Sequence, residues 1–313
     1  MNRILITGAA GKIGSTLREG LRDRYAVLRL SDIAPLDPAR AGEEIVRADL
    51  ADLAEVEVAM RGVDCVVHLG AIAGEDTWDK ILPNNVVGTW NVFEAARRQG
   101  VRRVIYASSH HAVGFYRRAR FIDQMVVPRP DGVYGVSKVF GEAVGRLFAD
   151  KHGLSVACLR IGAFRDKPAD RRLLRVWLSP RDAVQLVGCC IDAPDYHFIV
   201  VYGVSNNTRN RYRNAGIEFL GYRPQDKSED YAADILRTPD TEDAISREFH
   251  GGPYTQMGFD GEHGEAIALL GVVAEDDAGP ELDYADELDL GHPVAVAGRA
   301  TVPFHRHFRQ SPQ

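Results

Sequence analysis

The sequence of 313 residues predicts an α/β fold with a doubly wound parallel sheet. Short apolar runs alternate with segments of helical period through the first half, as in sheets whose parallel strands are joined by crossover helices. The first apolar run leads directly into a glycine-rich turn, and the next run ends at an aspartate about twenty residues on. These observations together predict a Rossmann-type arrangement.

The elements follow in order along the chain. Strands are expected at 3–7, 25–31, 44–47, 64–69, 102–107 and 154–161, and helices at 12–23, 52–61, 78–99 and 134–152. From residue 163 the alternation gives way to charged helices and short apolar runs such as Phe198 to Val201, which predict a small C-terminal substrate-binding cap. We therefore expect a dinucleotide-binding domain over 1–162, a substrate-binding region interleaved with it over 163–263, and an acidic tail over 264–313.

Composition narrows the class of protein. An apolar fraction of 45% with 26% charged residues is ordinary for a globular enzyme, and the net charge of −6 disfavours nucleic acid and anionic membranes as partners. The first strand begins almost at Met1 and the longest apolar run, Ala266 to Ala274, is short, so we expect a cytoplasmic protein. The four cysteines lack CxxC spacing and are expected as reduced thiols. His305 and His307 lack a partner carboxylate, so no metal is expected.

The glycine turn after the first strand predicts a phosphate-binding site. Gly8 permits a tight turn, Gly11 allows the backbone to approach a pyrophosphate, and Gly14 lets helix and strand pack closely. Lys12 and Ile13 complete this turn at the helix N-terminus, whose free N–H groups favour an anion. A glycine-rich turn alone is a weak signal, but this one lies between a strand and an amphipathic segment.

Asp32 follows the second apolar run. A carboxylate there can accept both hydroxyls of the adenosine ribose and would repel a 2′-phosphate, which favours NAD over NADP. The alternative is that Asp32 merely starts a turn, as the nearby prolines suggest.

Tyr134 and Lys138 predict proton transfer. Residues four apart share one face of a helix, so the ammonium is expected beside the phenol, where it would lower the tyrosine pKa and make Tyr134 a usable general base. The spacing is common by chance, and it gains weight only from the glycine turn upstream.

The assembled motifs resemble the extended short-chain dehydrogenase/reductase superfamily, and within it the NAD-dependent uronate dehydrogenases. The resemblance covers roughly residues 2–260. It rests on TGAAGKIG (7–14), HLGAIAG (68–74), NNVVGTWNVFEAA (84–96), YASSHHAVG (106–114), RPDGVYGVSKVFGE (129–142), LRIG (159–162), RRLLRVWLS (171–179) and FLGYRPQD (219–226).

The resemblance implies further contacts to the cofactor. Those expected beside the adenine, pyrophosphate, ribose or nicotinamide are Asp49, Leu50, Leu69, Gly70, Ala71, Asn85, Ser108, Tyr134, Lys138 and Ile161. For several of them a purely structural role, at a strand end or in helix packing, is an equal alternative.

The resemblance also implies the substrate site. Ser109 or His110 would polarise the reacting oxygen, where uronate dehydrogenases have asparagine followed by histidine and this chain has His110 and His111. Arg172 falls where the family binds the substrate carboxylate, and its planar fork suits that group. The remaining positions expected to touch substrate are His111, Tyr134, Tyr254, and the two alanines that replace family serines, Ala73 and Ala163.

The predicted function is oxidation of a cyclic uronic acid at its anomeric hydroxyl to an aldarolactone, with Tyr134 as base and NAD as hydride acceptor. A nucleotide-sugar epimerase or dehydratase on the same scaffold is the alternative enzyme, and a non-catalytic NAD-sensing protein is the alternative from another class. A homo-oligomer that pairs through the helices near 78–99 and 134–152 is possible.

Overall fold

The computed structural model describes residues 1–260, and its centre is a seven-stranded parallel sheet in the order β10-β7-β5-β4-β1-β2-β3. The strands are β1 (Arg3–Thr7), β2 (Val27–Ser31), β3 (Glu43–Ile45), β4 (Cys65–His68), β5 (Arg103–Ser109), β7 (Ser155–Ile161) and β10 (Phe198–Gly203). The order of the first five strands across the sheet is that of a Rossmann fold. The predicted fold class is confirmed.

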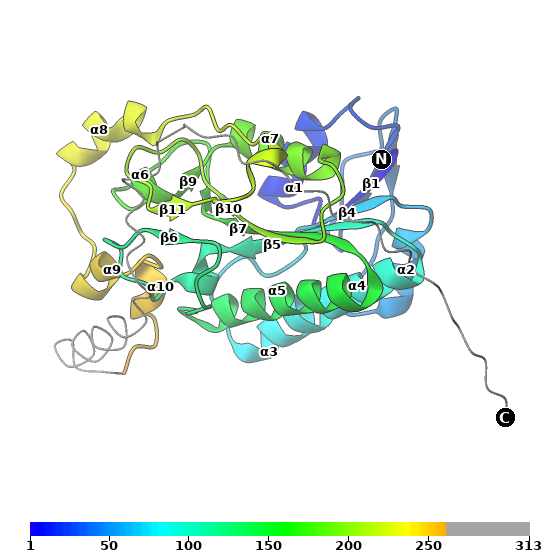
Figure 1. Ribbon diagram of the computed structural model, residues 1–313, viewed down its shortest axis with the longest axis horizontal. Coiled ribbons are helices and arrows are strands. Elements are labelled where there is room, and N and C mark those ends of the chain that lie inside the picture. Colours follow the sequence, from blue (N-terminus) through cyan, green and yellow to red (C-terminus); the bar gives the residue numbers. More distant parts are fainter. Residues whose placement is uncertain (261–313) are drawn as a thin grey trace, which may run out of the picture. The chain divides into compact units, whose positions relative to one another are not determined.

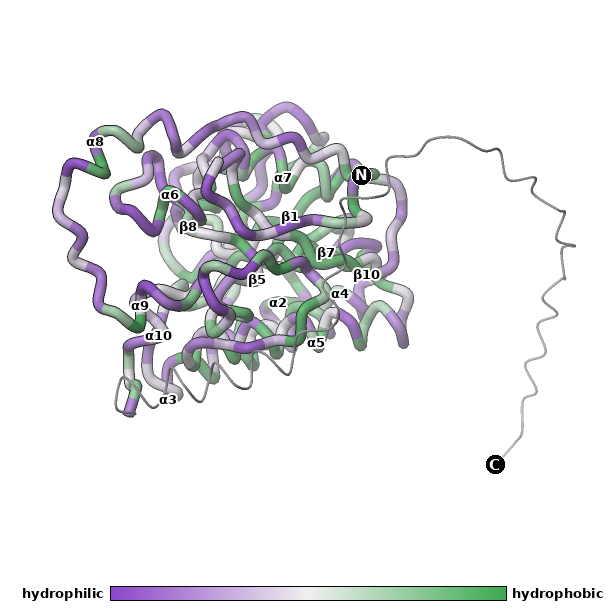
Figure 2. Tube along the Cα trace, turned by 60° about the vertical axis from the view of Figure 1, so that its left-hand side comes forward, coloured by the Kyte–Doolittle hydropathy of each residue, from purple (hydrophilic) through white to green (hydrophobic). Residues whose placement is uncertain are grey.

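Helices cover both faces of this sheet (Figure 1). On one face lie α1 (Lys12–Gly20) and α7 (Pro180–Asp192), and on the other α2 (Leu53–Met60), α4 (Gly88–Arg98) and α5 (Val133–His152). Because both faces are covered, β4, β5 and β7 are buried along their whole length. The apolar strands form the green centre of Figure 2, and the polar turns around them are purple.

The long helix predicted at 78–99 is interrupted. It consists of α3 (Trp78–Ile81), a π-helical segment η1 (Leu82–Val87) and α4. Pro83 lies in the π-helical segment, and proline removes a backbone donor and crowds the preceding turn, which explains the wider winding there. Asn84 and Asn85 belong to the same segment.

The assignment of Phe198 to Val201 to the cap is wrong. These residues belong to β10, which pairs in parallel with β7 from Phe198↔Val156 to Gly203↔Ile161 and forms an edge of the main sheet. Helix α7 provides the crossover between them, so the α/β alternation continues past residue 163. Arginines between the two strands obscured that pattern in the sequence.

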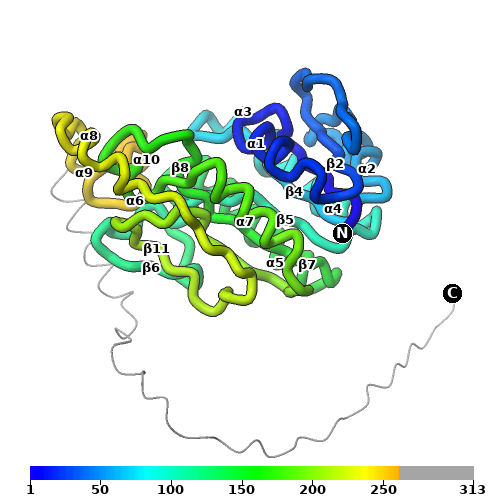
Figure 3. The backbone as a smooth tube through the Cα atoms, turned by 90° about the horizontal axis from the view of Figure 1, so that it is seen from above, coloured from blue at the N-terminus to red at the C-terminus, as the bar shows by residue number. Residues whose placement is uncertain are grey.

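The remaining elements of the described chain are short, and α6, α8, α9, α10, β6 and β11 gather at one end of the sheet in Figure 3. They are η2 (His110–Val113), β6 (Ile122–Asp123), β8 (Ala163–Phe164), α6 (Leu173–Val176), β9 (Trp177–Leu178), β11 (Tyr212–Arg213), η3 (Glu218–Leu220), η4 (Ser228–Tyr231), α8 (Ala232–Arg237), α9 (Ala244–Glu248) and α10 (Pro253–Gln256). Strands β6 and β11 form one small parallel sheet and β8 and β9 another.

The state of the cysteines and the absence of membrane-spanning helices were both predicted from the sequence. All four cysteines are free thiols, and Cys65, Cys158 and Cys190 are buried. Among the helices within residues 1–260, none combines the length and the apolar character that a bilayer crossing requires. The predicted acidic tail over 264–313, with its two histidines, lies outside the described residues.

Candidate active site

A cavity of about 760 Å³ opens at the carboxyl ends of the strands, where open α/β sheets bind ligands. The predicted site residues that line it are Gly8, Gly11, Lys12, Ile13, Gly14, Asp32, Asp49, Leu50, Leu69, Gly70, Ala71, Ala73, Ser108, Ser109, His110, His111, Tyr134, Lys138, Ile161, Ala163, Arg172 and Tyr254. The structure therefore brings the predicted cofactor and substrate residues to one cavity.

Asn85 is the predicted residue that does not line this cavity. Its Oδ1 accepts from the Ile72 N–H at 2.8 Å, and its Nδ2 donates to the Ile72 carbonyl at 3.1 Å and to Ser137 Oγ at 3.1 Å. The side chain is 1% exposed, and its amide holds the loop after β4 against α5. Its neighbour Asn84 lines the cavity instead.

The glycine turn has the shape that a pyrophosphate requires. Gly8 has φ +69°, and a Cβ on it would lie 2.6 Å from the Gly70 nitrogen. A Cβ on Gly14 would lie 2.4 Å from the Gly8 carbonyl oxygen, so the turn and α1 pack backbone against backbone. Gly11 is the N-cap of α1 and makes no side-chain cap, which leaves first-turn N–H groups directed at the cavity. These residues fit a dinucleotide phosphate.

Asp32 lies just beyond β2 at the cavity wall. Its Oδ2 accepts from the Ala10 N–H at 2.9 Å and its Oδ1 from the Ala34 N–H at 2.9 Å. The turn and the ribose-binding functions are therefore compatible, because each carboxylate oxygen keeps a further lone pair for a ribose hydroxyl.

Tyr134 and Lys138 lie on the first turns of α5, as predicted. The Lys138 ammonium is 5.3 Å from the centroid of the Tyr134 ring and donates to the Ala107 carbonyl at 2.9 Å. Burial lowers the pKa of Lys138 to about 8. Burial also raises the pKa of Tyr134, although a hydrogen bond from Ser109 acts in the opposite direction.

The pKa of Tyr134 is therefore raised in the described structure, because burial outweighs the lowering that was expected from Lys138. Removing the phenol from water disfavours its charged form and raises its pKa. The same desolvation disfavours the protonated form of Lys138 and lowers the pKa of its ammonium.

Ser109 and His110 differ in what they can still bind. Ser109 Oγ accepts from the His111 N–H at 3.2 Å and interacts with the Tyr134 phenol. Both ring nitrogens of His110 have protein partners, Nδ1 with the Tyr212 hydroxyl at 3.1 Å and Nε2 with Arg172 Nη2 at 3.1 Å. Ser109 is thus the better placed donor for a reacting oxygen.

His111 belongs to an oriented pair that the sequence did not reveal. Its Nδ1 lies 2.6 Å from Asp131 Oδ2, and its ring stacks on Tyr254 with centroids 4.0 Å apart and planes 14° apart. Burial lowers the pKa of His111, while the Asp131 carboxylate acts against that shift. Tyr254 thereby forms one wall of the cavity beside Tyr134.

Arg172 presents a cation with spare hydrogen-bonding capacity. Its Nε–H is buried without a partner among residues 1–260, and burial lowers the pKa of its guanidinium. A buried cation with an unmatched donor is costly unless an anion pairs with it, and a carboxylate suits its planar fork.

Two acidic residues support the site and were missed. Glu75 accepts from the Val133 N–H at 2.8 Å and from the Tyr134 N–H at 3.0 Å, so it caps α5 from the loop after β4. Glu142 accepts from Ser108 Oγ at 2.6 Å and pairs with Arg160. The lack of any acid in the first turn of α5 was the available signal for a distant cap.

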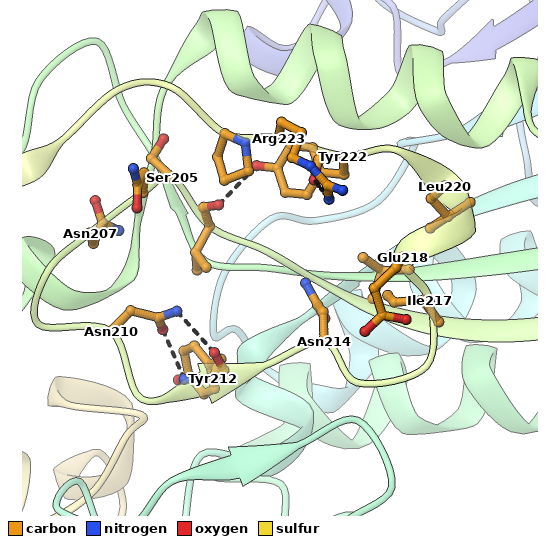
Figure 4. A pocket seen from close by; sticks show the side chains of 14 residues that line it. Ser205, Asn207, Asn210, Tyr212, Asn214, Ile217, Glu218, Leu220, Tyr222 and Arg223 are labelled. Carbon is orange, nitrogen blue, oxygen red and sulfur yellow. Dashed lines mark hydrogen bonds between the residues drawn. The ribbon is translucent and has the colours of Figure 1, made fainter. Parts of the chain in front are cut away.

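A second hollow of about 210 Å³ lies beside β10 and β11 (Figure 4). Its amide side chains bond to backbone: Asn207 to Arg175 and Trp177, and Asn210 to both backbone groups of Tyr212. These amides hold the chain rather than offer polar atoms to a ligand.

Residues 4–178 match the model of the NAD dependent epimerase/dehydratase family, and the chain belongs to that family. Membership of this NAD-dependent family confirms the predicted cofactor, NAD. The chain is 41% identical over 259 residues to a uronate dehydrogenase of Pseudomonas putida, which covers 82% of this chain and 97% of that protein. It is 38% identical to an NAD-dependent glucose-6-phosphate dehydrogenase of Haloferax volcanii, covering 73% and 95%.

A solved structure of similar fold is the uronate dehydrogenase of Agrobacterium tumefaciens. It superposes with a TM-score of 0.78 at 41% identity and covers 82% of this chain and 97% of that chain. The resemblance to uronate dehydrogenases noted in the sequence is confirmed.

Proposed function

We propose that this protein is an NAD-dependent dehydrogenase that oxidises a cyclic uronic acid at its anomeric hydroxyl to an aldarolactone. The observation that carries the proposal is a single cavity lined by the glycine turn, by Tyr134 with Lys138, and by a buried guanidinium, Arg172, with an unmatched donor. The similar uronate dehydrogenases support the same reaction.

Each residue of the site has its own role in the proposed reaction. The glycine turn and Asp32 hold the dinucleotide, and bound NAD supplies the acceptor for the hydride from the anomeric carbon. Ser109 donates to the anomeric oxygen, and Tyr134 takes the hydroxyl proton as the carbonyl forms. Lys138, whose pKa is about 8, is mostly protonated at neutral pH and stabilises the phenolate. Arg172 binds the distant carboxylate and fixes the ring.

Two positions lower the number of contacts to sugar hydroxyls. Ala73 and Ala163 line the cavity and offer no side-chain donor. Each missing neutral hydrogen bond costs about 0.5–1.5 kcal/mol, so recognition depends more strongly on Arg172 than on hydroxyl partners.

The test is a panel of uronic acids, neutral aldoses, glucose 6-phosphate and nucleotide sugars, scored by the absorbance of reduced nicotinamide with NAD and NADP compared. Net NADH formation on uronates supports the proposal. An epimerase or dehydratase returns its hydride and forms no net NADH, and a sensing protein binds NAD without turnover on any compound. Preference for glucose 6-phosphate would favour the activity named for the Haloferax relative.

We further propose a homo-oligomer formed through α3, η1, α4 and α5. Large apolar side chains are exposed on these elements, namely Trp78, Val87, Trp90, Val136 and Leu147. Trp90→Glu is expected to shift the mass measured by light scattering to that of the monomer; an unchanged mass would exclude this face. A cytoplasmic location is supported by the four free thiols, which suit a reducing compartment.

A further inference from the structure

Three side chains form a continuous chain of contacts at the substrate end of the cavity. Arg172 Nη2 lies 3.1 Å from His110 Nε2, and His110 Nδ1 lies 3.1 Å from the Tyr212 hydroxyl. His110 is 2% exposed and Tyr212 is 6% exposed. The three residues come from η2, from the segment before α6, and from β11, so only the folded chain assembles them.

The protonation of His110 follows from these contacts. A guanidinium has only donors and keeps its proton, so Nε2 must accept and must carry no hydrogen. The ring proton of a neutral imidazole then resides on Nδ1, which donates to the Tyr212 oxygen. Burial, and next to it the neighbouring cationic Arg172, keep the pKa of His110 well below its ordinary value, in agreement with a neutral ring.

Tyr212 is itself held firmly. Asn210 donates to its carbonyl at 2.9 Å and accepts from its N–H at 2.8 Å, as the two dashed lines in Figure 4 show. Its ring stacks on Tyr202 with centroids 4.5 Å apart and planes 15° apart. Asn214 binds both backbone groups of Tyr202 in the same way. The hydroxyl of Tyr212 is thus a fixed acceptor for His110.

The other side of Arg172 is also confined. Gly252 has φ +61°, and a Cβ on it would lie 2.5 Å from Arg172 Cδ and Nε. The guanidinium is therefore limited by backbone on one side and by His110 Nε2 on the other. Its Nε–H retains no partner among the described residues.

We propose that Tyr212 and His110 are positioning residues that fix the plane of Arg172, and that they thereby set the preference for sugars bearing a carboxylate over neutral sugars. The inference rests on the proposed function and goes beyond it, because it places the source of selectivity in two residues behind the arginine. Neither residue transfers a proton in the reaction.

The first test compares two tyrosines of the same stack. Tyr212→Phe removes the acceptor of His110 and keeps the ring, and Tyr202→Phe removes a hydroxyl that donates to the Asp123 carbonyl at 2.9 Å and keeps the ring. Tyr212→Phe is expected to raise the KM for a uronate by roughly tenfold, the effect of one buried hydrogen bond, with kcat and the KM for NAD little changed. Tyr202→Phe is expected to leave the ratio of kcat/KM for uronate over neutral aldose unchanged.

The second test requires no activity. Long-range ¹H–¹⁵N correlation spectra of the histidine-labelled protein, with His110 assigned from His110→Asn, are expected to show a protonated Nδ1 and a bare Nε2. In Tyr212→Phe the Nδ1 proton loses its acceptor and the ring is free to leave Arg172, so the Nε2-protonated form is expected to appear.

The outcomes separate the two proposals. If no NADH forms on uronates, the proposed function fails. The ¹H–¹⁵N spectra would still test the contacts of His110 with Arg172 and Tyr212. With uronate oxidation intact, an unchanged selectivity ratio in Tyr212→Phe, an equal change in Tyr202→Phe, or an Nε2-protonated His110 in the unmodified protein would each overturn the positioning role.

Discussion

The two ends of the cavity are built differently. The phosphate-binding part of the cofactor end consists of backbone from one contiguous turn, in which Gly14 packs against the Gly8 carbonyl with no room for a Cβ. The substrate end consists of side chains from distant segments, in which Arg172, His110 and Tyr212 meet through single hydrogen bonds. The first end is defined by steric exclusion and the second by the orientation of polar groups, so substitutions should affect them in different ways.

The largest expected effect lies where the two ends meet. Tyr134→Phe is expected to lower kcat by about 10²–10⁴-fold, since it removes the proton acceptor, while the Kd for NAD from fluorescence titration stays within about twofold. Tyr196→Phe is the matched control, because that buried hydroxyl donates to the Cys190 carbonyl, outside the cavity lining. Unchanged turnover in Tyr134→Phe would remove the tyrosine from the mechanism.

A change confined to the substrate end comes next. Arg172→Lys keeps the charge and loses the planar fork, so kcat/KM for a uronate is expected to fall by about 10–100-fold, as for the loss of a charge-assisted hydrogen bond. The kcat/KM for a neutral aldose should change little. An equal loss on both sugars would mean that Arg172 supports the fold and not the carboxylate.

A change confined to the cofactor end should act on NAD alone. Gly14→Ala forces a Cβ to within 2.4 Å of the Gly8 carbonyl oxygen, so the Kd for NAD from calorimetry is expected to rise by roughly tenfold or more. Gly100→Ala serves as control, because Gly100 has no heavy atom within 4 Å of its Cβ position, although its φ of +69° makes an alanine there strained. It should lower the melting temperature with no effect on this Kd.

The smallest expected effect compares a buried neutral histidine in each region. Burial lowers the pKa of His68, on β4, to about 3 and that of His250, in the cap, to about 4. The unfolded chain protonates near pH 6.5, so it binds more protons below that pH and stability falls as the pH is lowered. His68→Gln is expected to reduce this loss between pH 6.5 and 5 by roughly 1–2 kcal/mol in urea unfolding, and His250→Gln by a similar amount. A slope unchanged by either variant would contradict the neutral form in the fold.

The contrast between the ends also explains what the sequence could predict. The turn from Gly8 to Gly14 is encoded by residues that are adjacent in the sequence, and Asp32 directly follows a strand. Their positions at the cavity could therefore be predicted. The supports at the substrate end were not, because Asp131, Glu75 and Tyr212 reach the site only through tertiary contacts. Periodicity predicted α1, α2, α5 and most strands of the main sheet. The crossover helix α7 and strand β10 were missed because an arginine-rich segment precedes α7.

Asn210 and Asn214 have a practical consequence for directed evolution. Each satisfies both backbone groups of one stacked tyrosine through its own amide, Asn210 those of Tyr212 and Asn214 those of Tyr202. A mutant library that retains these two asparagines together with Tyr212 can vary Arg211 and Arg213 while the residues behind Arg172 keep their positions. Randomising the asparagines as well should free the backbone of Tyr202 and Tyr212 and so disturb the position of Arg172.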